Sequence, residues 1–347
     1  MKTAVLDRVC LEQIFERISG VNALLVGDIC VDAYWYADML RSTLSRETPH
    51  FNLPVTRERY VLGAGGNVLN NMAALRPKEV CPLTVIGADW RGELALKLIA
   101  QTGASDRFVI RDEKRVTPAY CKPMKMGYAG VLSEDPRVDF ENSEPLLEST
   151  QNALLDALDR AAKWADVIAV SDQFNFGVVT PGLREALAET GARGKLIIVD
   201  SRDRAGLFKN VMLKPNELES AAITGIQPES VTPEAYLPVA RAVSRLGGRG
   251  AVVTLGAQGA VCAGGDGECA FAPACALEPP FDIVGAGDTF LSALSLSLAA
   301  GAGLDKAAMA GNLASGVTVK KLNQTGTASR EEMLSLYDKM LKGDVTA

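Results

Sequence analysis

Short runs of valine, isoleucine and leucine recur along the chain and alternate with amphipathic stretches of helical spacing. The apolar runs occupy residues 23–26, 83–86, 167–170, 196–199 and 251–254. Helical patterns lie between them, over residues 93–101, 146–164, 181–190 (closed by Gly191), 216–223 and 233–246. Apolar strands separated by helices are typical of βαβ units, because the strands of a parallel sheet are buried on both faces. We therefore predict an α/β fold with a doubly wound, mostly parallel sheet flanked by helices.

Two regions, residues 31–62 and about 116–140, interrupt this alternation. Both contain aromatic, proline-punctuated extended segments without a helical pattern. We expect a small accessory β-sheet, a lid over a site at the carboxyl edge of the main sheet, where ligands bind in open α/β folds. A decorative hairpin or a dimer surface would give the same pattern. Because no linker divides the chain, we predict a single domain over residues 1–347.

Composition and charge exclude several classes of protein. A net charge of −6 and short, broken basic clusters argue against nucleic-acid binding. The most apolar segment, residues 289–300, is shorter than the roughly 18 residues of a membrane span, so we expect a buried helix and no membrane partner. Residues 1–20 have the pattern of a surface helix and not of a signal peptide. Seven cysteines without a C-x-x-C pair favour a reducing compartment, and we predict a cytoplasmic protein.

A glycine-rich turn followed by an aspartate and an apolar helix carries the strongest chemical signal. Gly285, Ala286 and Gly287 let backbone amides converge at a helix N-terminus, which favours an anion such as a phosphoryl group in transit. Asp288 comes next and can accept a hydroxyl proton as the oxygen attacks. A carboxylate base is expected because His50 is the only histidine in the chain. The structural alternative is that Asp288 caps its helix.

A second glycine turn is a candidate for binding nucleotide phosphates. Thr254, Gly256 and Gly259 follow a predicted strand, so a hydroxyl and backbone amides can approach an anion there. The spacings of the dinucleotide fingerprint and of the P-loop do not occur in the sequence. Rossmann dehydrogenases and P-loop enzymes are therefore disfavoured.

The run Asn216-Glu217-Leu218-Glu219 is a candidate for binding the metal and the nucleotide. Its amide and carboxylates lie at the start of a predicted helix. Asn216 and Glu219 are suited to holding a hydrated Mg²⁺ beside phosphates, since this ion usually keeps several waters. A helix N-cap with a capping-box glutamate has the same pattern.

Four residues near the N-terminus are candidates for binding the substrate. Asp28 ends the first core strand and Asp32 lies four residues on, where carboxylates can bind sugar hydroxyls. Capping of a turn is the alternative for such an aspartate. Gly63 and Asn67 belong to a glycine-rich turn before a predicted helix at 68–75, where a ligand can approach the backbone closely.

Taken in chain order, these motifs resemble the PfkB (ribokinase-like) family of carbohydrate kinases, over about residues 21–336. The resemblance implies ATP and Mg²⁺ as cofactors and leaves a monovalent cation open. It implies that Asp288 is the catalytic base, that residues 285–287 form an anion hole, and that Asn216 and Glu219 organise Mg²⁺ and phosphates. A small β-sheet lid would cover the sugar. Asn312 would lie near the adenine.

Within the family, the chain most resembles heptose-7-phosphate kinases, found as the kinase half of a bifunctional lipopolysaccharide-precursor enzyme. The matching stretches are residues 27–28 with 32–36, then 137–141 and 171–172. The implied activity is ATP-dependent phosphorylation of a sugar or sugar phosphate, with D-glycero-D-manno-heptose 7-phosphate as a candidate acceptor. Fructose phosphate, ribose, a nucleoside or a keto-sugar acid are alternatives. If the protein is not an enzyme, the alternative is a non-catalytic sensor of a sugar or nucleotide with the same fold. The chain ends soon after the kinase pattern, so we expect no fused nucleotidyltransferase domain.

Three positions depart from the family pattern. The paired glycines appear as Gly63 and Ala64, and the residues nearest to the basic lid residues are Tyr120 and Lys122. The third departure is residues 200–202, where Asp-Ser-Arg replaces Asp-Pro-Lys.

The first lid region is rich in aromatic residues, among them Tyr34, Trp35, Tyr36 and Phe51. A small sheet with such side chains would expose an apolar face if it stood alone over the pocket. Pairing of two lids would cover that face. We therefore predict a homodimer joined through the lids.

Overall fold

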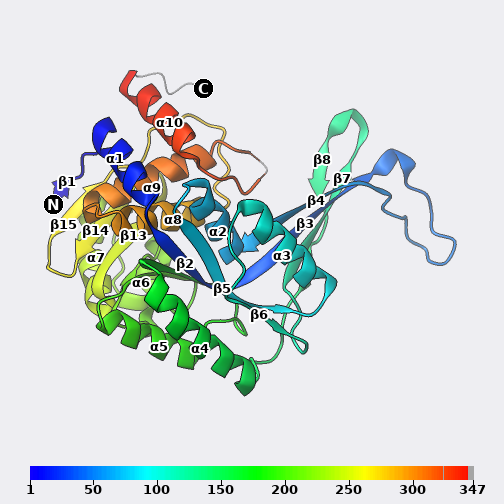
Figure 1. Cartoon of the computed structure of the whole chain (residues 1–347). Helices are drawn as coiled ribbons and strands as arrows, with labels where there is room; N and C mark the ends of the chain where they lie inside the picture. The colour runs from blue at the N-terminus through cyan, green and yellow to red at the C-terminus, as the bar shows by residue number, and fades with distance from the viewer. Residues whose placement is uncertain (323, 343–347) are drawn as a thin grey trace.

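The computed structural model describes residues 1–322 and 324–342, which form two β-sheets of unequal size (Figure 1). The expected domain of residues 1–347 extends beyond these residues at 323 and 343–347. Ten strands of the described chain form the main sheet. In spatial order they are β1 (Lys2–Thr3), β15 (Cys269–Ala272), β14 (Ala260–Gly264), β13 (Gly248–Thr254), β12 (Val211–Leu213), β11 (Leu196–Ser201), β10 (Val167–Asp172), β2 (Asn22–Gly27), β5 (Glu79–Gly87) and β6 (Val109–Asp112).

The central strands of the main sheet all pair in parallel, from β13 through β12, β11, β10, β2 and β5 to β6. Antiparallel pairing occurs where β14 meets β13 and β15. Each apolar run of the sequence lies within one of these strands. The prediction of a mostly parallel, doubly wound sheet is therefore confirmed.

Helices cover both faces of the main sheet (Figure 1). One face is covered by α1 (Arg8–Ile18), α2 (Gly65–Ala74), α3 (Trp90–Thr102), α8 (Ala286–Ala299), α9 (Leu304–Thr318) and α10 (Arg330–Lys342). The other face is covered by α4 (Glu148–Trp164), α5 (Pro181–Ala192), α6 (Glu217–Thr224) and α7 (Pro233–Gly247). Alternate residues of β2 point to opposite faces of the sheet. Ala23 and Leu25 pack in the core on the α8 side, and Leu24 and Val26 pack in the core on the α4 side.

Several predicted helix boundaries need correction. Gly191 does not close its helix but lies inside α5, which continues to Ala192. The helix after the Gly63 turn begins at Gly65 and not at residue 68. At the N-terminus, Lys2–Thr3 pair with β15, and the helix occupies only Arg8–Ile18. The helix expected from residue 146 begins at Glu148. Most of these differences are of one to three residues, as expected where capping decides the ends.

The small sheet has the order β4 (Val55–Ala64), β3 (Ile29–Asp38), β7 (Ala119–Met126) and β8 (Leu132–Glu134), with β9 (Val138–Phe140) also paired to β7. These strands occupy most of the two regions that lacked the βαβ pattern. Asp28 alone separates β2 of the main sheet from β3 of the small one. The small sheet projects from the body of the molecule and ends in a long hairpin (Figure 1). One of its faces, with Val31 and Ala33, joins the core beneath α3.

The aromatic residues of the small sheet are less exposed than the sequence predicted. Tyr34 and Tyr36 are 9% and 8% exposed. The guanidinium of Arg59 lies 4.4 Å from the ring centre of Tyr34, and that of Arg57 lies 3.9 Å from that of Tyr36. The expected exposed face is therefore wrong for these two tyrosines. Phe51, in contrast, is 69% exposed.

The segment at residues 289–300 is confirmed as a buried helix, since nearly all of α8 is enclosed between the main sheet, α2 and α9. No helix in the described part of the chain is long and apolar enough to cross a membrane.

Candidate active site

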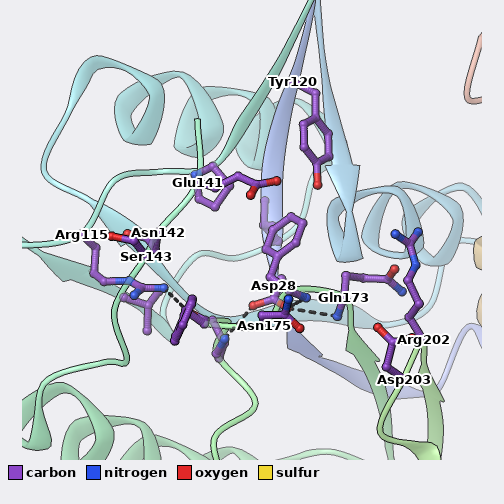
Figure 2. Close-up of a pocket in the computed structure, with 16 residues that line it drawn as sticks. Asp28, Arg115, Tyr120, Glu141, Asn142, Ser143, Gln173, Asn175, Arg202 and Asp203 are labelled. Atoms are coloured by element: carbon purple, nitrogen blue, oxygen red, sulfur yellow. Dashed lines mark hydrogen bonds between the residues drawn. The ribbon is translucent and has the colours of Figure 1, made fainter. Parts of the chain in front are cut away.

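A cavity of about 440 Å³ lies at the carboxyl ends of β2 and β10, where the chain leaves the main sheet for the small one (Figure 2). Tyr120 of the small sheet closes it on one side. Its polar lining includes Asp28, Arg115, Tyr120, Glu141, Asn142, Ser143, Gln173, Asn175, Arg202 and Asp203. Such a position is where open α/β sheets bind their ligands. Asp28 is the predicted substrate residue found in this lining.

Asp288 lies in the first turn of α8, but it is not the N-cap. Gly285 occupies the cap position with φ of +80°, a conformation that favours glycine. The carboxylate of Asp288 instead accepts a hydrogen bond of 2.8 Å from Nδ2 of Asn67. The capping interpretation is therefore wrong for Asp288, and its side chain is directed towards the glycine-rich turn of α2.

The environment of Asp288 raises the pKa of its side chain above that of an aspartate in water. Burial raises the pKa of its carboxyl to about 6, and the charge of Asp200 adds to the increase. The hydrogen bond from Asn67 and the positive charges of Lys214 and Arg202 lower this pKa in part. A carboxylate with a pKa of about 6 is ionised at neutral pH and is a stronger base than a free aspartate, as a general base requires.

Gly285 also provides the space that Asn67 needs. A β-carbon at position 285 would lie 2.6 Å from Nδ2 of Asn67, which is closer than real contacts allow. Asn67 is 2% exposed, and its own carbonyl accepts from the side chain of Asn71. The glycine-rich turn of α2 and that of α8 are thus in direct contact.

A buried ion pair that sequence reasoning missed lies beside Asp288. Nζ of Lys214 is 2.9 Å from Oδ2 of Asp200, and Lys214 is 3% exposed. Burial lowers the pKa of Lys214, but the nearby carboxylates of Asp200, Glu219 and Asp288 raise it overall. Lys214 directly follows β12, and Asp200 lies within β11, one residue before its end. A charged residue at the end of an apolar strand was the signal available in the sequence, where Lys214 and Asp200 had been given no role.

The Asn216-Glu217-Leu218-Glu219 run begins α6 with a complete capping box. Oδ1 of Asn216 accepts from the amide of Glu219, and Oε2 of Glu219 accepts from the amide of Asn216, both at 2.8 Å. Burial raises the pKa of Glu219, and the negative charge of Asp200 adds to it. Leu218 is 74% exposed, and the carbonyl of Glu217 accepts from the hydroxyl of Tyr236. The capping geometry is present, and it leaves Glu219 close enough to Asp200 to interact with it electrostatically.

The second glycine turn lies next to this helix start. Thr254 and Asn216 form an isolated parallel bridge, so the two nucleotide motifs are neighbours. Gly256 and Gly259 have φ of +53° and +101° in the turn after β13. Asn312 of α9 is buried, and its amide donates to the carbonyls of Ala272 and Pro273. In this structure the Asn312 side chain fixes the end of β15.

Asp32 and Gly63 lie in the small sheet above the cavity. Asp32 is 6% exposed, and its Oδ2 is 3.3 Å from Nζ of Lys122. A β-carbon at Gly63 would lie 2.7 Å from Sγ of Cys30 and 3.0 Å from Cγ of Asp32. Glycine at position 63 therefore lets β3 and β4 pack side by side. Close approach of a ligand to Gly63 stays a prediction.

A fold of this kind, with a partly buried carboxylate and a glycine-rich turn at a helix N-terminus beside a lysine, has the architecture of a small-molecule kinase. The profile of the pfkB family of carbohydrate kinases matches residues 22–330. The chain therefore belongs to the pfkB carbohydrate kinase family. Membership of this family confirms the resemblance predicted from the motifs. It supports an enzyme and not the non-catalytic sensor that was the alternative.

Curated relatives agree with this assignment. The chain is 35% identical over 308 residues to the bifunctional protein HldE of Caulobacter vibrioides. This alignment covers 88% of the chain and 61% of that protein. It is 31% identical over 335 residues to the bifunctional protein HldE of Trichlorobacter lovleyi, covering 95% of the chain and 65% of that protein. The chain thus spans less than two thirds of the length of these relatives.

Solved structures share the fold. Ribokinase of Arabidopsis thaliana, complexed with ribose and ATP, has a TM-score of 0.67 at 16% identity, covering 91% of this chain and 98% of that one. Phosphofructokinase-2 of Escherichia coli, in complex with substrates and products, has a TM-score of 0.69 at 20% identity. The match covers 93% of this chain and 99% of that one. These similarities confirm the ribokinase-like α/β fold with its small second sheet.

Proposed function

We propose that this carbohydrate kinase transfers the γ-phosphoryl group of ATP to a hydroxyl of a sugar phosphate, with D-glycero-D-manno-heptose 7-phosphate as the acceptor. In this proposal the acceptor oxygen bonds to the γ-phosphorus, ADP leaves with the electrons of the broken P–O bond, and Asp288 takes the hydroxyl proton. The observation that carries the proposal is the position of Asp288, which lies at a helix N-terminus with a pKa raised to about 6.

Positive charge is available where the phosphoryl group would pass. Lys214 and Arg202 both act electrostatically on Asp288, and the backbone of residues 285–287 starts α8. The glycine turn with Thr254, Gly256 and Gly259 would hold the phosphates of the nucleotide. Asn312 would lie near the adenine by resemblance only.

The acidic residues present suit Mg²⁺ bound through water. Asp200 and Glu219 interact unfavourably with each other, so a cation near both would relieve the repulsion. In the described residues no group of three or more histidine, cysteine or acidic side chains could hold an ion directly. Asn216 and Glu219 would hold the hydrated ion, which would neutralise charge on the phosphates. A monovalent cation stays an open prediction.

A phosphorylated acceptor is favoured by the basic residues above the cavity. Lys122 interacts with Asp32, and the guanidinium of Arg137 lies 4.1 Å from the ring centre of Tyr120, which lines the cavity. Both cations act electrostatically on Cys30, two residues from Asp28. The resemblance to heptose-7-phosphate kinases supports the same class of acceptor. A phosphate on the acceptor would meet these side chains as the small sheet closes.

The test is ADP release with a panel of acceptors at fixed ATP and Mg²⁺. The panel contains D-glycero-D-manno-heptose 7-phosphate, fructose 6-phosphate, ribose, a nucleoside and a keto-sugar acid. The proposal requires the highest kcat/KM for the heptose phosphate. It also requires that Lys122→Met raises KM for the heptose phosphate at least tenfold, while Lys125→Met, on the opposite face of β7, leaves it unchanged. A higher kcat/KM for an unphosphorylated acceptor would reject it.

We further propose that residues 31–62 and 116–140 act as a lid within a single kinase domain and join two chains as a homodimer. The support is an exposed apolar set on the projecting sheet and its hairpin, comprising Leu40, Leu44, Phe51, Leu53, Val55, Tyr128, Val131 and Leu132. Dimerisation would cover these side chains. Sedimentation at micromolar concentration should give a dimer, and Phe51→Asp should shift it to monomer. A monomeric wild-type protein would contradict this arrangement.

Closure of the lid over the acceptor would exclude water from the reacting groups. Trp35 lies on β3 and is partly buried against the core. Its fluorescence, measured in a variant without Trp90 and Trp164, should change more with the heptose phosphate than with ATP. Equal changes with both ligands would contradict a sugar-gated lid. A cytoplasmic location also stays a prediction.

A further inference from the structure

The loop that follows β10 supplies much of the cavity wall. Residues 173–178 leave the end of β10 directly beside the end of β2, since Ser171 pairs with Gly27. Figure 2 shows Gln173 and Asn175 beside Asp28 in the middle of the cavity. The lining residues from this loop are Gln173, Phe174, Asn175, Phe176 and Val178. The conformation of the loop therefore determines the shape of the cavity.

The carboxylate of Asp28 binds the backbone of this loop. Its Oδ2 accepts from the amides of Gln173 and Phe174, at 3.1 and 3.0 Å, and its Oδ1 accepts from the amide of Val178, at 2.6 Å. Asp28 is 2% exposed. A carboxylate has about four acceptor positions, and three are occupied here. At most one is left for a substrate hydroxyl.

Gly177 lets the loop reach this carboxylate. A β-carbon at position 177 would lie 2.4 and 2.5 Å from the two carboxylate oxygens of Asp28. The backbone of Gly177 is not in the left-handed region, so any residue could adopt its conformation if the space were free. The contact with Asp28 is thus what requires glycine at this position.

Two arginines hold the carbonyls of the same loop. Nη2 of Arg204 donates to the carbonyl of Phe174, at 2.7 Å, while the guanidinium forms two bonds to the buried carboxylate of Asp172. On the other side, Arg115 donates to the carbonyls of Phe176 and Glu144. Amides of the loop are bound by Asp28, and its carbonyls are bound by Arg204 and Arg115.

We propose that loop 173–178 is the acceptor-recognition element of this kinase, and that Asp28, Arg115 and Arg204 are positioning residues that fix its backbone. The proposal rests on the proposed function, in that the cavity is taken as the acceptor site. Gln173 and Asn175 then select the acceptor with their side chains. Asp28 acts through the loop and not by binding a sugar hydroxyl itself. Burial raises its pKa to about 6, so at neutral pH it is ionised and accepts all three amide bonds.

The sharpest test is Gly177→Ala, which adds one methyl group against Asp28 and removes no side chain from the cavity. We expect KM for D-glycero-D-manno-heptose 7-phosphate to rise at least tenfold, with kcat and KM for ATP changed less than twofold. The control is Gly182→Ala in α5, where a β-carbon would have no neighbour within 4 Å. An unchanged acceptor KM in Gly177→Ala overturns the proposal.

A double-mutant cycle distinguishes positioning from direct binding by Asp28. The second partner of the cycle is Arg204, which holds the same loop through the carbonyl of Phe174. If Asp28 acts through the loop, Arg204→Lys has little further effect on the acceptor KM in the Asp28→Ala background. If Asp28 binds the sugar directly, the two losses multiply, and the positioning role is rejected. Arg204→Lys is a milder companion, since it keeps a positive charge beside Asp172 but cannot form the same set of bonds. It should raise the acceptor KM in the same way.

Amide hydrogen exchange separates a failure of this proposal from a failure of the proposed function, because it needs no acceptor. In the wild-type protein the amides of Gln173, Phe174 and Val178 should be protected. In Gly177→Ala their exchange should accelerate at least tenfold, while helix α5 keeps its protection. If the heptose phosphate is not turned over but the exchange follows this pattern, only the assigned acceptor is wrong. Unchanged exchange at these three amides rejects the anchoring role of Asp28.

Discussion

Asn67 and Asp288 are 221 residues apart in the sequence and are joined by a hydrogen bond of 2.8 Å between Nδ2 and Oδ2. The bond connects the start of α2, which follows the small sheet, with the start of α8, where phosphoryl transfer is proposed. The hydrogen bond stabilises the ionised carboxylate and so lowers the pKa of Asp288, whereas burial raises it. Asn67, predicted as a substrate residue, thus also tunes the proposed base.

Asn67→Ala is expected to shift the pH dependence of the reaction. A general base must be ionised, so kcat/KM of the wild-type enzyme should fall as the pH drops below about 6. Loss of a hydrogen bond to the charged form raises the pKa of Asp288, so the acid limb should move up by roughly one pH unit. Rates from pH 5 to 8 measure this. The exposed Asn152→Ala is the control, and an unmoved limb in Asn67→Ala would contradict the account.

Glu219→Gln distinguishes the capping role of Glu219 from its proposed metal role. Glutamine can also complete a capping box, so the free energy of unfolding should change by no more than ~0.5 kcal/mol. Loss of the negative charge should raise the Mg²⁺ concentration needed for half-maximal activity severalfold. A Mg²⁺ titration at saturating ATP and a denaturant titration test the two parts. An unchanged Mg²⁺ requirement would leave only the capping role.

Lys214→Met should be costly for both stability and activity. It leaves Asp200 buried without its partner, which typically destabilises a protein by ~3–5 kcal/mol. The double variant Lys214→Met with Asp200→Leu removes both charges and should recover most of the stability, but not the turnover. Thermal unfolding and ADP release are measured on the same samples. Recovered turnover in the double variant would show that Lys214 has only a structural role.

Ala64→Gly should stabilise the protein, because Ala64 has φ of +51° and ψ of −131° before α2. Such a conformation strains a residue with a β-carbon by ~1–3 kcal/mol, whereas glycine adopts it readily. The greater chain entropy of unfolded glycine offsets ~0.4–1 kcal/mol of the gain. A net increase of about 1 kcal/mol in the free energy of unfolding is expected from denaturant titration. A decrease would show that the strain is absent.

The sequence was sufficient to predict the layers of the fold. Its apolar runs are short and continuous, as expected for strands of a sheet that helices cover on both faces. Positions 27–28 and 285–288 could be selected as candidates because glycines and acids occur there next to a strand or a helix, but the pattern left capping as an alternative role. Helix ends were less certain. Gly191, for example, would fit a helix terminus, but it lies inside α5, where a β-carbon would come 2.1 Å from the carbonyl oxygen of Asn210.

Long-range side-chain pairs could not be predicted from the sequence. Lys214 and Asp200 lie at the carboxyl ends of the neighbouring strands β12 and β11, and nothing in the sequence near either residue indicates the other. The same holds for the anchoring of loop 173–178 by Asp28, where a turn-capping aspartate and a sugar ligand have the same local pattern. Burial of Tyr34 and Tyr36 depended on Arg57 and Arg59 of the adjacent strand, whose register the sequence did not specify.

Asp288→Asn provides the folded, inactive variant that the central claim needs. The folded-state pKa of Asp288, about 6, lies above its ordinary value of 3.8, so the wild-type protein loses stability as the pH rises from about 4 through 6. Asparagine does not titrate and can still accept from Asn67. The variant should therefore match the wild type near pH 4 and exceed its stability at pH 8, by ~1–3 kcal/mol.

The most direct test of the account is single-turnover phosphoryl transfer by Asp288→Asn at pH 8, with ATP, Mg²⁺ and D-glycero-D-manno-heptose 7-phosphate. We predict that the rate of transfer falls by ~10²-fold or more, since removal of a general base typically has an effect of this size. ATP binding, measured by titration calorimetry, should stay within about twofold of the wild-type value. A variant that keeps more than about a tenth of the wild-type rate would contradict Asp288 as the catalytic base.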